Sequence, residues 1–351
     1  MKMNAEQDRV ATIGIDTGKN TLHLIGLNSQ GKIVLKQKIS RVQASKRFAN
    51  LRPCLVGIEA CVGAHHLSRE LMALGHEVKL VPAVYAIPFR KSHKNDFRDA
   101  EAIAEAVCRP TMRFVPTKTP EQLDLQALHR IRARLVSQRT AVINQIRCFV
   151  LERGIAVRKG VRFLRQSLPD ILAKRTDVLS PRMIHMLEDL SGDWRRLDSR
   201  IDDVTSEIEA LAKADAACQR LMTVPGIGPI IASAMVAAIG DGAAFRRGRD
   251  YAAWLGLVPK QISTGDRTIL GRISKRGNSY LRMLFMQGAR VLLLRPANWP
   301  KHSFGPWLIA AAQRLHRNVL ATALANKLAR IAWSVLSRDD DYAPMLQARA
   351  G

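Results

Sequence analysis

Along residues 10–110, apolar residues form short runs separated by polar turns, and the period of the pattern changes partway. Residues 10–16, 21–27 and 33–39 are apolar runs of strand length, and the turn at 29–32 separates the last two. They predict a three-strand meander. Beyond it we expect helices over 44–51, 64–74 and 96–107, alternating with strands over 54–59 and 78–81. The predicted order is βββαβαβα, an α/β arrangement.

From residue 119 onward the apolar positions have helical spacing. Apolar residues recur to about residue 160, mostly at intervals of three or four residues and in places at longer intervals. This spacing predicts one long helix. We expect Pro169 and Pro181 to break the pattern. A second apolar series then runs from Trp194 to Leu211 through a charged segment. It predicts either a coiled coil or a packed helical hairpin, because both have the same spacing over so few heptads.

The third region begins near residue 219 and is predicted to be mainly helical. Residues 221–229 read Leu-Met-Thr-Val-Pro-Gly-Ile-Gly-Pro, and an apolar segment follows to residue 239. Gly226 and Gly228 allow a tight turn whose free backbone N–H groups could hold a phosphate, as in a helix-hairpin-helix module. An ordinary glycine-rich turn between helices is the alternative. The chain is therefore predicted to have three parts, residues 9–112, 119–215 and 219–338.

Charge adds information that the apolar pattern lacks. The 351 residues include 55 Lys and Arg against 30 Asp and Glu, a net charge of +25. Residues 246–330 contain sixteen Lys or Arg and only two acids, Asp250 and Asp266. Such a local excess predicts a polyanionic partner, and nucleic acid is the commonest one. Four aromatic residues in or near this segment could stack on bases, although core packing would also explain each: Trp254, Tyr280, Trp299 and Trp307.

Several classes of protein are disfavoured by what the chain lacks. Its five cysteines are widely spaced and never form a Cys-x-x-Cys pair, so neither a disulfide framework nor a zinc site is expected. The first residues do not read as a signal peptide. We find no continuous run of about 18 apolar residues that would cross a membrane. The expected location is the cytoplasm.

Four acids stand out by their positions in the predicted elements. Asp16 and Glu59 each end a predicted strand, whereas Asp96 and Asp99 lie three residues apart on a predicted helix, which places both on one face. Each has an ordinary alternative as a turn residue, a helix cap or a partner of nearby arginines. Four converging carboxylates would repel one another without a cation. The set therefore predicts Mg²⁺ or Mn²⁺, and two such ions could stabilise both the attacking and the leaving oxygen of a phosphodiester.

These segments resemble a known family of enzymes. Residues 13–16 (Ile-Gly-Ile-Asp), 57–60 (Gly-Ile-Glu-Ala) and 95–100 (Asn-Asp-Phe-Arg-Asp-Ala) are similar to the DEDD motif of RuvC-like transposases in the one-hundred-and-ten family of bacterial insertion sequences. Residues 251–281 resemble the C-terminal transposase domain of that family, and the version here is most similar to the eleven-eleven subgroup. The resemblance extends over residues 9–336.

The resemblance implies a fold and an activity. The N-terminal domain would be RNase H-like, a helical coiled-coil segment would follow, and the C-terminal domain would supply a serine nucleophile to the same composite site. The enzyme would cleave and rejoin DNA strands of a donor and a target. It would act as a homo-oligomer, a dimer or tetramer, guided by an RNA from the element.

The nucleophile is where this sequence departs from the family. A serine directly precedes glycine in family members, whereas Ser263-Thr264-Gly265 has threonine there. We favour Ser263 because a primary hydroxyl is less hindered, and hold Thr264 as the alternative. Ser274 is expected to contact phosphate, with a helix cap as its alternative. Further expected nucleic-acid contacts, besides Gly226 and Gly228, are Lys260, Arg267, Arg272, Lys275, Arg276 and Arg282.

Two other functions compete with this one. Asp16-Thr-Gly-Lys19 resembles the phosphate loop of an actin-like or sugar-kinase-like ATPase, but no second glycine-rich phosphate loop follows it. A non-catalytic architectural protein that binds DNA through the helix-hairpin-helix segment would leave the four acids unexplained. Acids beside DNA weaken binding unless a metal neutralises them.

Overall fold

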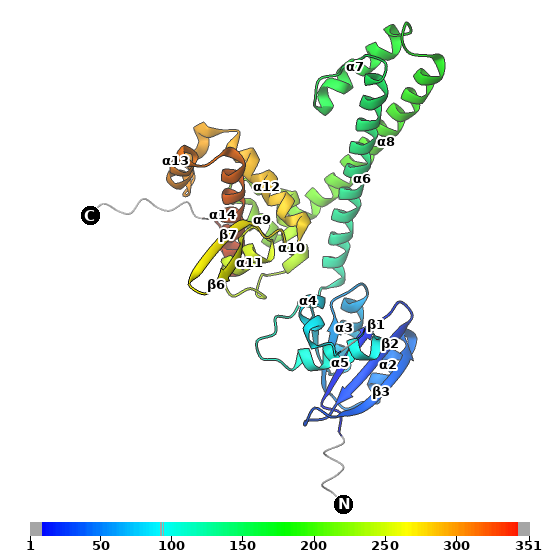
Figure 1. The fold of residues 1–351 in the computed structure, drawn as a ribbon, viewed down its shortest axis with the longest axis vertical. Helices are drawn as coiled ribbons and strands as arrows, with labels where there is room; N and C mark the ends of the chain where they lie inside the picture. Colours follow the sequence, from blue (N-terminus) through cyan, green and yellow to red (C-terminus); the bar gives the residue numbers. More distant parts are fainter. Residues whose placement is uncertain (1–8, 92, 94, 343–351) are drawn as a thin grey trace, which may run out of the picture. The chain divides into compact units, whose positions relative to one another are not determined.

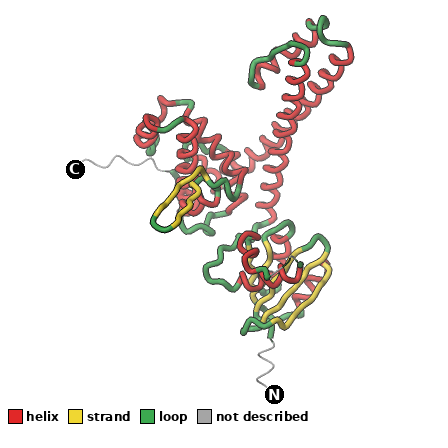
Figure 2. Tube along the Cα trace, in the orientation of Figure 1, coloured by secondary structure: helices red, strands yellow, loops and turns green. Residues whose placement is uncertain are grey.

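The computed structural model describes residues 9–91, 93 and 95–342, which form two compact units that meet in sequence after Pro120 (Figure 1). Unit 1 contains a five-stranded sheet with helices, and unit 2 is mainly helical with one exposed two-stranded sheet (Figure 2). The α/β plus α fold class is therefore confirmed at this level.

The sheet of unit 1 is mixed. Its strands are β1 (Thr12–Thr17), β2 (Thr21–Leu27), β3 (Ile33–Ser40), β4 (Leu55–Glu59) and β5 (Glu77–Val81). Their spatial order is β3-β2-β1-β4-β5. β1, β2 and β3 pair antiparallel as the predicted meander, whereas β4 and β5 run parallel to β1. Parallel pairing brings the carboxyl ends of β1 and β4 to the same edge of the sheet.

Helices cover both faces of this sheet. Its helical segments are α2 (Ala44–Ala49), α3 (Ala64–Ala73), α4 (Ala83–Ala86) and α5 (Asp96–Val107), with 3₁₀ turns at Arg41–Gln43 and Ile87–Phe89. Phe48 of α2 and Leu71 of α3 pack against Ile13 and Ile15. The α5 helix packs on the other face. The segment containing α4 was not predicted, since only four residues of it are α-helical and no apolar period can form.

Strand periodicity decides which side chains face α5. Ile13 and Ile15 point to the α2 and α3 face, so Gly14 and Asp16 point the opposite way. An added Cβ at Gly14 would lie 2.0 Å from the carbonyl oxygen of Ala100, which shows how closely α5 approaches β1. Small residues at this contact let the helix pack directly on the strand.

Unit 2 begins with a helical hairpin. The long helices α6 (Pro120–Leu151) and α8 (Pro181–Ala214) run antiparallel, with α7 (Val161–Lys174) between them in sequence (Figure 1). Two hydrogen bonds fix their register: Arg132 Nε donates to Thr205 Oγ1 at 2.8 Å, and an Arg139 guanidinium N–H donates to Asp198 Oδ1 at 3.2 Å. Of the two alternatives left open by the sequence, the described chain forms the packed hairpin.

The two prolines predicted to interrupt the helical pattern behave differently: Pro181 lies at a helix boundary, and Pro169 does not. Pro169 lies inside α7 and does not end it, so that expectation is wrong. The apolar face of α7, with buried Leu164, Leu168 and Ile171, packs against the helical hairpin and stabilises the helix despite one missing hydrogen bond. Pro181 is the first residue of α8, where proline costs no hydrogen bond.

The helical elements that follow α8 in unit 2 form one hydrophobic core: α9 (Ala216–Met222), α10 (Pro229–Ile239), α11 (Gly248–Trp254), α12 (Ser279–Leu293), a 3₁₀ turn (Pro296–Lys301), α13 (Gly305–Arg314) and α14 (Arg317–Arg338). Between α11 and α12, the strands β6 (Pro259–Thr264) and β7 (Arg267–Ile273) form an exposed β-hairpin that lies outside this core. The predicted helix, glycine turn and helix are present as α9 and α10. A separate hydrophobic cluster joins α6, α7 and α8. The division of the chain into three domains stays a prediction.

The expectation that no segment could span a membrane needs one correction. By length and composition alone, α14 is apolar enough to cross a bilayer. Half of that stretch is buried inside unit 2, where Leu324 and Leu328 belong to the hydrophobic core. A buried core helix meets the same length and hydropathy criteria as a spanning one.

Candidate metal centre and nucleic-acid surface

The four predicted acids converge on one cavity of about 380 Å³ in unit 1. Asp16 is the fifth residue of β1 and Glu59 is the last residue of β4. The two strands are parallel neighbours, with Ile15 opposite Ile58, so the two acids emerge at the same edge. Asp96 and Asp99 enter the cavity from α5. The acids therefore come from three elements that the fold brings together.

The first turn of α5 is shaped by its cap. The Asn95 side chain accepts a hydrogen bond from the backbone N–H of Phe97 at 2.9 Å, so Asn95, and neither aspartate, caps the helix. Asp96 and Asp99 then occupy the first turn, where the helix dipole stabilises negative charge. The capping alternative for these two acids is thereby removed.

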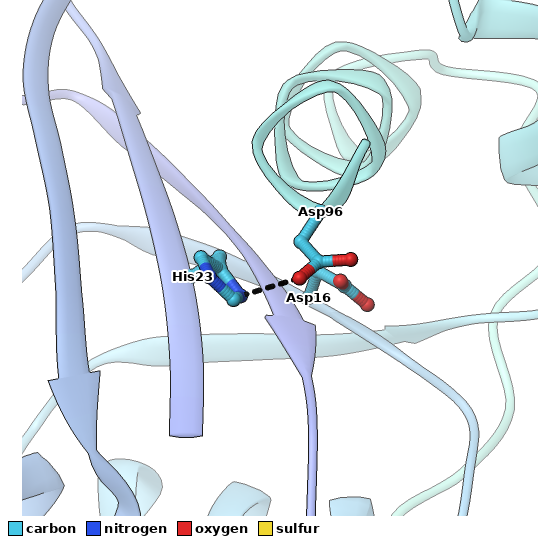
Figure 3. A group of neighbouring side chains, drawn as sticks. All are labelled: Asp16, His23 and Asp96. Atoms are coloured by element: carbon cyan, nitrogen blue, oxygen red, sulfur yellow. Dashed lines mark ion pairs between the residues drawn. The ribbon is translucent and has the colours of Figure 1, made fainter. Parts of the chain in front are cut away.

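His23 is a member of the site that the sequence analysis missed. It lies on β2 directly opposite Asp16, and its Nδ1 atom is 3.6 Å from Asp96 Oδ2 (Figure 3). One donor atom from each of these three residues lies within 4.8 Å of the others. The sequence did contain a signal for His23, because the position of the turn between β1 and β2 determines which residue of the hairpin faces Asp16.

The electrostatics of the cavity favour a bound cation. Burial, and then repulsion from Asp96, Asp99 and Glu59, raise the pKa of Asp16 to about 6, and His23 partly opposes this shift. A divalent cation would relieve the same repulsion. The carboxylate oxygens suit Mg²⁺ or Mn²⁺, which prefer oxygen ligands. The residues present therefore fit such an ion.

Arg90 supplies part of the missing positive charge. Its guanidinium lies 3.3 Å from Asp99 Oδ1, so the predicted alternative of an arginine partner is also realised. The two readings are compatible, because Asp99 has a second carboxylate oxygen and both side chains line the cavity. Glu101 and Glu105, farther along α5, instead pair with Lys91 and do not line the cavity.

Ser263 and Thr264 lie on an exposed hairpin of unit 2. No strand was predicted in this region, but β6 and β7 form a two-stranded sheet in which Ser263 faces Thr268 and Thr264 faces Arg267. The Gln261 amide N–H donates to Ser263 Oγ at 2.8 Å. Gly265 and Asp266 form the two-residue turn, a known hairpin signal that the sequence analysis did not use. Both hydroxyl groups remain candidates for the nucleophile.

Most of the predicted phosphate contacts are exposed around this hairpin. Lys260, Arg267, Arg272, Lys275 and Arg276 are all solvent-exposed. A two-stranded ribbon of this kind fits the major groove of DNA.

Other members of the predicted set also have structural roles. Arg282 donates to the backbone carbonyls of Leu255 and Arg276 at 2.8 and 3.0 Å. Ser274 accepts from the Arg276 N–H, and Asn278, not Ser274, caps α12. 

The glycines of the α9–α10 turn differ. Gly226 has a φ of +82°, and an added Cβ would lie 2.8 Å from Leu292, so backbone conformation and packing already require glycine there. Gly228 begins α10 with no atom within 4 Å of an added Cβ. Its surroundings leave room for a ligand.

An α/β unit with a carboxylate-lined cavity, together with a helical unit that exposes a cationic hairpin, is the arrangement of an enzyme that processes nucleic acid. Residues 13–153 match the DEDD family described as Transposase, and residues 218–303 match the one described as Transposase IS116/IS110/IS902 family. The chain belongs to the IS110 family of transposases and to its IS1111 subgroup. It is a DNA transposase.

Three relatives show how far the similarity extends. A probable family 20 transposase of Pseudomonas aeruginosa is 44% identical over 95% of this chain and 99% of its own length. The transposase for insertion sequence element IS1328 of Yersinia enterocolitica is 40% identical over 94% and 97%. The transposase for insertion sequence element IS1111A of Coxiella burnetii is 41% identical over 95% and 91%. These matches do not support the two competing hypotheses, an ATPase and a purely architectural DNA-binding protein.

Proposed function

We propose that Asp16, Glu59, Asp96 and Asp99 bind Mg²⁺ or Mn²⁺ and that this site cleaves and rejoins DNA strands of a donor and a target. The observation that carries the proposal is the convergence of all four carboxylates on one cavity. A metal bound there would supply a Lewis acid for a phosphodiester oxygen. The fold of unit 1 is, in this proposal, RNase H-like.

The protein's own residues prepare the cavity for that role. Asp16 and Asp96 offer the closest carboxylate oxygens, and Glu59 and Asp99 complete the acidic lining. His23, whose side chain is 9% exposed, holds Asp96 in position from the sheet side. Arg90 orients Asp99 and offers an N–H group to a phosphate oxygen.

We further propose that Ser263 is the nucleophile, with Thr264 as the alternative. In this step a bond forms between Ser263 Oγ and phosphorus while one phosphorus–oxygen bond to deoxyribose breaks, and the hydroxyl proton is transferred so that a deoxyribose hydroxyl leaves. The exposure of the hairpin supports the assignment, because DNA must reach the hydroxyl.

The partners follow from charge and from the family resemblance. Sixteen cations against two acids over residues 246–330 suit a surface for donor and target DNA and for a guide RNA from the element. Phosphate contacts are proposed for the exposed cations of β6, β7 and the loop before α12, and for the backbone near Gly228. Assembly into a dimer or tetramer is proposed on the resemblance.

The metal assignment is tested by replacing Asp99 with Asn, which removes charge while preserving size. We expect strand cleavage in Mg²⁺ to fall by at least about a hundredfold, and the Mg²⁺-dependent rise in melting temperature to shrink, while DNA binding persists. Asp16→Asn should behave alike.

Glu101→Gln is the matched control, because Glu101 is on the same helix but pairs with Lys91 outside the cavity. It should retain wild-type cleavage and metal response. Full activity of Asp99→Asn in Mg²⁺ would contradict the proposed site.

A further inference from the structure

A second hollow of unit 1 shares a wall with the acidic cavity. The wall is the segment containing α4 and the following 3₁₀ turn. Ala86 and Ile87 line the acidic cavity, whereas Tyr85, Pro88 and Phe89 line a neighbouring hollow of about 640 Å³. One short segment therefore contributes to two concave surfaces.

The chemistry of the second hollow differs from that of the first. Its opposite wall is formed by residues 109–113, including Arg109, Met112 and Arg113, and among the described residues no carboxylate lines it. The Arg109 guanidinium lies 5.3 Å from the centre of the Phe89 ring. Tyr85 is 43% exposed, and its neighbours Val84 and Ile87 are 66% and 56% exposed, so the segment presents a group of exposed apolar residues. The hollow thus combines one exposed aromatic ring, that of Tyr85, with two cations, one of which lies over the half-buried ring of Phe89.

We propose that this hollow binds an unpaired nucleotide of the strand whose phosphate enters the acidic cavity. The base stacks against Tyr85, and the phosphates pair with Arg113 and with Arg109, which lies over the Phe89 ring. Aromatic faces beside guanidinium groups are the chemistry that recognises single-stranded nucleic acid, since every base has a π face and every linkage a negative charge. The strand's place in the reaction rests on the proposed function, but binding of an unpaired nucleotide does not.

The fold also sets the spacing between the two sites. Asp99 and Arg109 are ten residues apart along α5 and its immediate continuation, which is about 15 Å at 1.5 Å per residue. Stacked nucleotides are about 3.4 Å apart along one strand. The bound base therefore lies within about four nucleotides of the phosphate at the acids.

Photocrosslinking of the full-length protein tests the site without any catalytic step. Single-stranded DNA and RNA oligonucleotides of one sequence, carrying 5-iodouracil, are irradiated with the protein in EDTA, and tryptic peptides are mapped by mass spectrometry. We expect a crosslink in peptide 80–90, which contains Tyr85 and Phe89. The DNA and RNA arms show which strand occupies the hollow.

Charge variants separate binding from crosslinking chemistry. Arg109→Gln and Arg113→Gln keep both aromatic rings, so each should lower the yield in peptide 80–90 at least about fivefold. Arg52→Gln removes an exposed cation before β4 that does not line the hollow, and should leave the yield unchanged. Val84→Ala is the control for the exposed apolar side chains of the segment. Equal melting temperatures of the variants would show that folding is intact.

Two results would overturn the inference. One is crosslinking confined to peptides of unit 2. The other is a crosslinking yield in peptide 80–90 that stays unchanged in Arg109→Gln and Tyr85→Leu, while both variants form smaller assemblies than the wild type in sedimentation velocity. That result would identify the hollow as a contact between copies of the protein. A different experiment tests the proposed function: Mg²⁺-dependent cleavage that survives in Asp99→Asn would contradict it and would leave the crosslinking result unaffected.

Discussion

At the residue scale, the assignment that the structure constrains least is that of the nucleophile, for which two adjacent hydroxyl groups are candidates. Ser263 and Thr264 alternate in direction on β6, so they face opposite sides of the hairpin. Only one of them can face a given phosphate. The Gln261 amide donates to the Ser263 hydroxyl and leaves its proton free for transfer.

We therefore expect Ser263→Ala to abolish a covalent protein–DNA adduct, whereas Thr264→Val retains it. The adduct is trapped with a nicked or suicide DNA substrate in Mg²⁺ and mapped by mass spectrometry. Ser274→Ala, on the loop after the hairpin, is the control. An adduct that persists in Ser263→Ala and disappears in Thr264→Val would transfer the role to Thr264. No adduct in the wild type, under conditions that support recombination, would indicate attack by water or a 3′-hydroxyl.

Another residue links the long helix of unit 2 to the core of that unit. His129 on α6 is buried, and its ring nitrogens lie 3.0 Å from the hydroxyl oxygens of Tyr280 and Ser233. Burial, and then the nearby charge of Arg132, lower the pKa of His129 to about 4. The neutral imidazole is thus the form that the fold accommodates.

This shift predicts a loss of stability in mild acid. In the unfolded chain, histidine binds a proton near pH 6.5, whereas native His129 does so only near pH 4, so the free energy of unfolding falls as pH drops through that window. The loss should be about 2 kcal/mol at pH 5. Denaturant unfolding at pH 7 and pH 5 measures it. His129→Gln should reduce the dependence but not remove it, because burial also lowers the pKa of His65 to about 4. His185→Gln, at an exposed position of α8, is the control and should leave the dependence unchanged.

At the element scale, the candidate site depends on how closely α5 packs on β1. Gly14 and Gly57 lie on the strand face that meets this helix, and an added Cβ at Gly57 would lie 3.0 Å from side-chain atoms of Ile103 and Val107. At Gly14 the obstruction is helix backbone, which cannot rotate away. The position of Asp96 and Asp99 over Asp16 therefore depends on a glycine two residues earlier.

Gly14→Ala should displace α5 from the sheet. We expect the free energy of unfolding to fall by about 1–3 kcal/mol and metal affinity to fall with it, because Asp96 and Asp99 move away from Asp16. Chemical denaturation and Mg²⁺ titration measure the two effects. Gly192→Ala is the control, since in α8 the added methyl group meets only the flexible end of Arg196 and should be neutral or stabilising. Unchanged metal affinity in Gly14→Ala would contradict this coupling.

At the scale of the whole molecule, net charge sets how the protein meets nucleic acid. A charge of +25 steers any polyanion to the surface, and the cations of residues 246–330 are hardly offset by acids. Binding should therefore release many counterions.

The logarithm of the affinity for DNA should fall steeply with the logarithm of salt concentration, by about 10³- to 10⁵-fold between 50 and 200 mM if six to ten phosphates are bound. Arg272→Gln and Arg276→Gln should each reduce the slope by about one. Arg282→Gln should also lower the melting temperature, because its guanidinium holds two backbone carbonyls. Fluorescence anisotropy of labelled DNA, titrated with protein at a series of salt concentrations, measures these slopes. A flat dependence would rule out a phosphate-dominated interface.

The sequence alone determined the strands and the longer helices of unit 1, and the three elements from which its four acids emerge. Alternating apolar residues specify strands, and a strand-end acid such as Asp16 or Glu59 can be recognised without coordinates. The same local logic missed the β6–β7 hairpin, because its strands are exposed on both faces and lack the alternation that burial imposes. It also misjudged Pro169, where tertiary packing of α7 outweighs one lost hydrogen bond.

Only the tertiary structure decided which side chains share the cavity. His23 joins Asp16 through strand register, and Arg90 reaches Asp99 from a segment without a periodic pattern. The helical series of α6 and α8 likewise fits a coiled coil or a hairpin until Arg132 and Thr205 are seen to pair. Periodicity reports the environment of each residue along its own element. Contacts between elements depend on distances that sequence spacing does not contain.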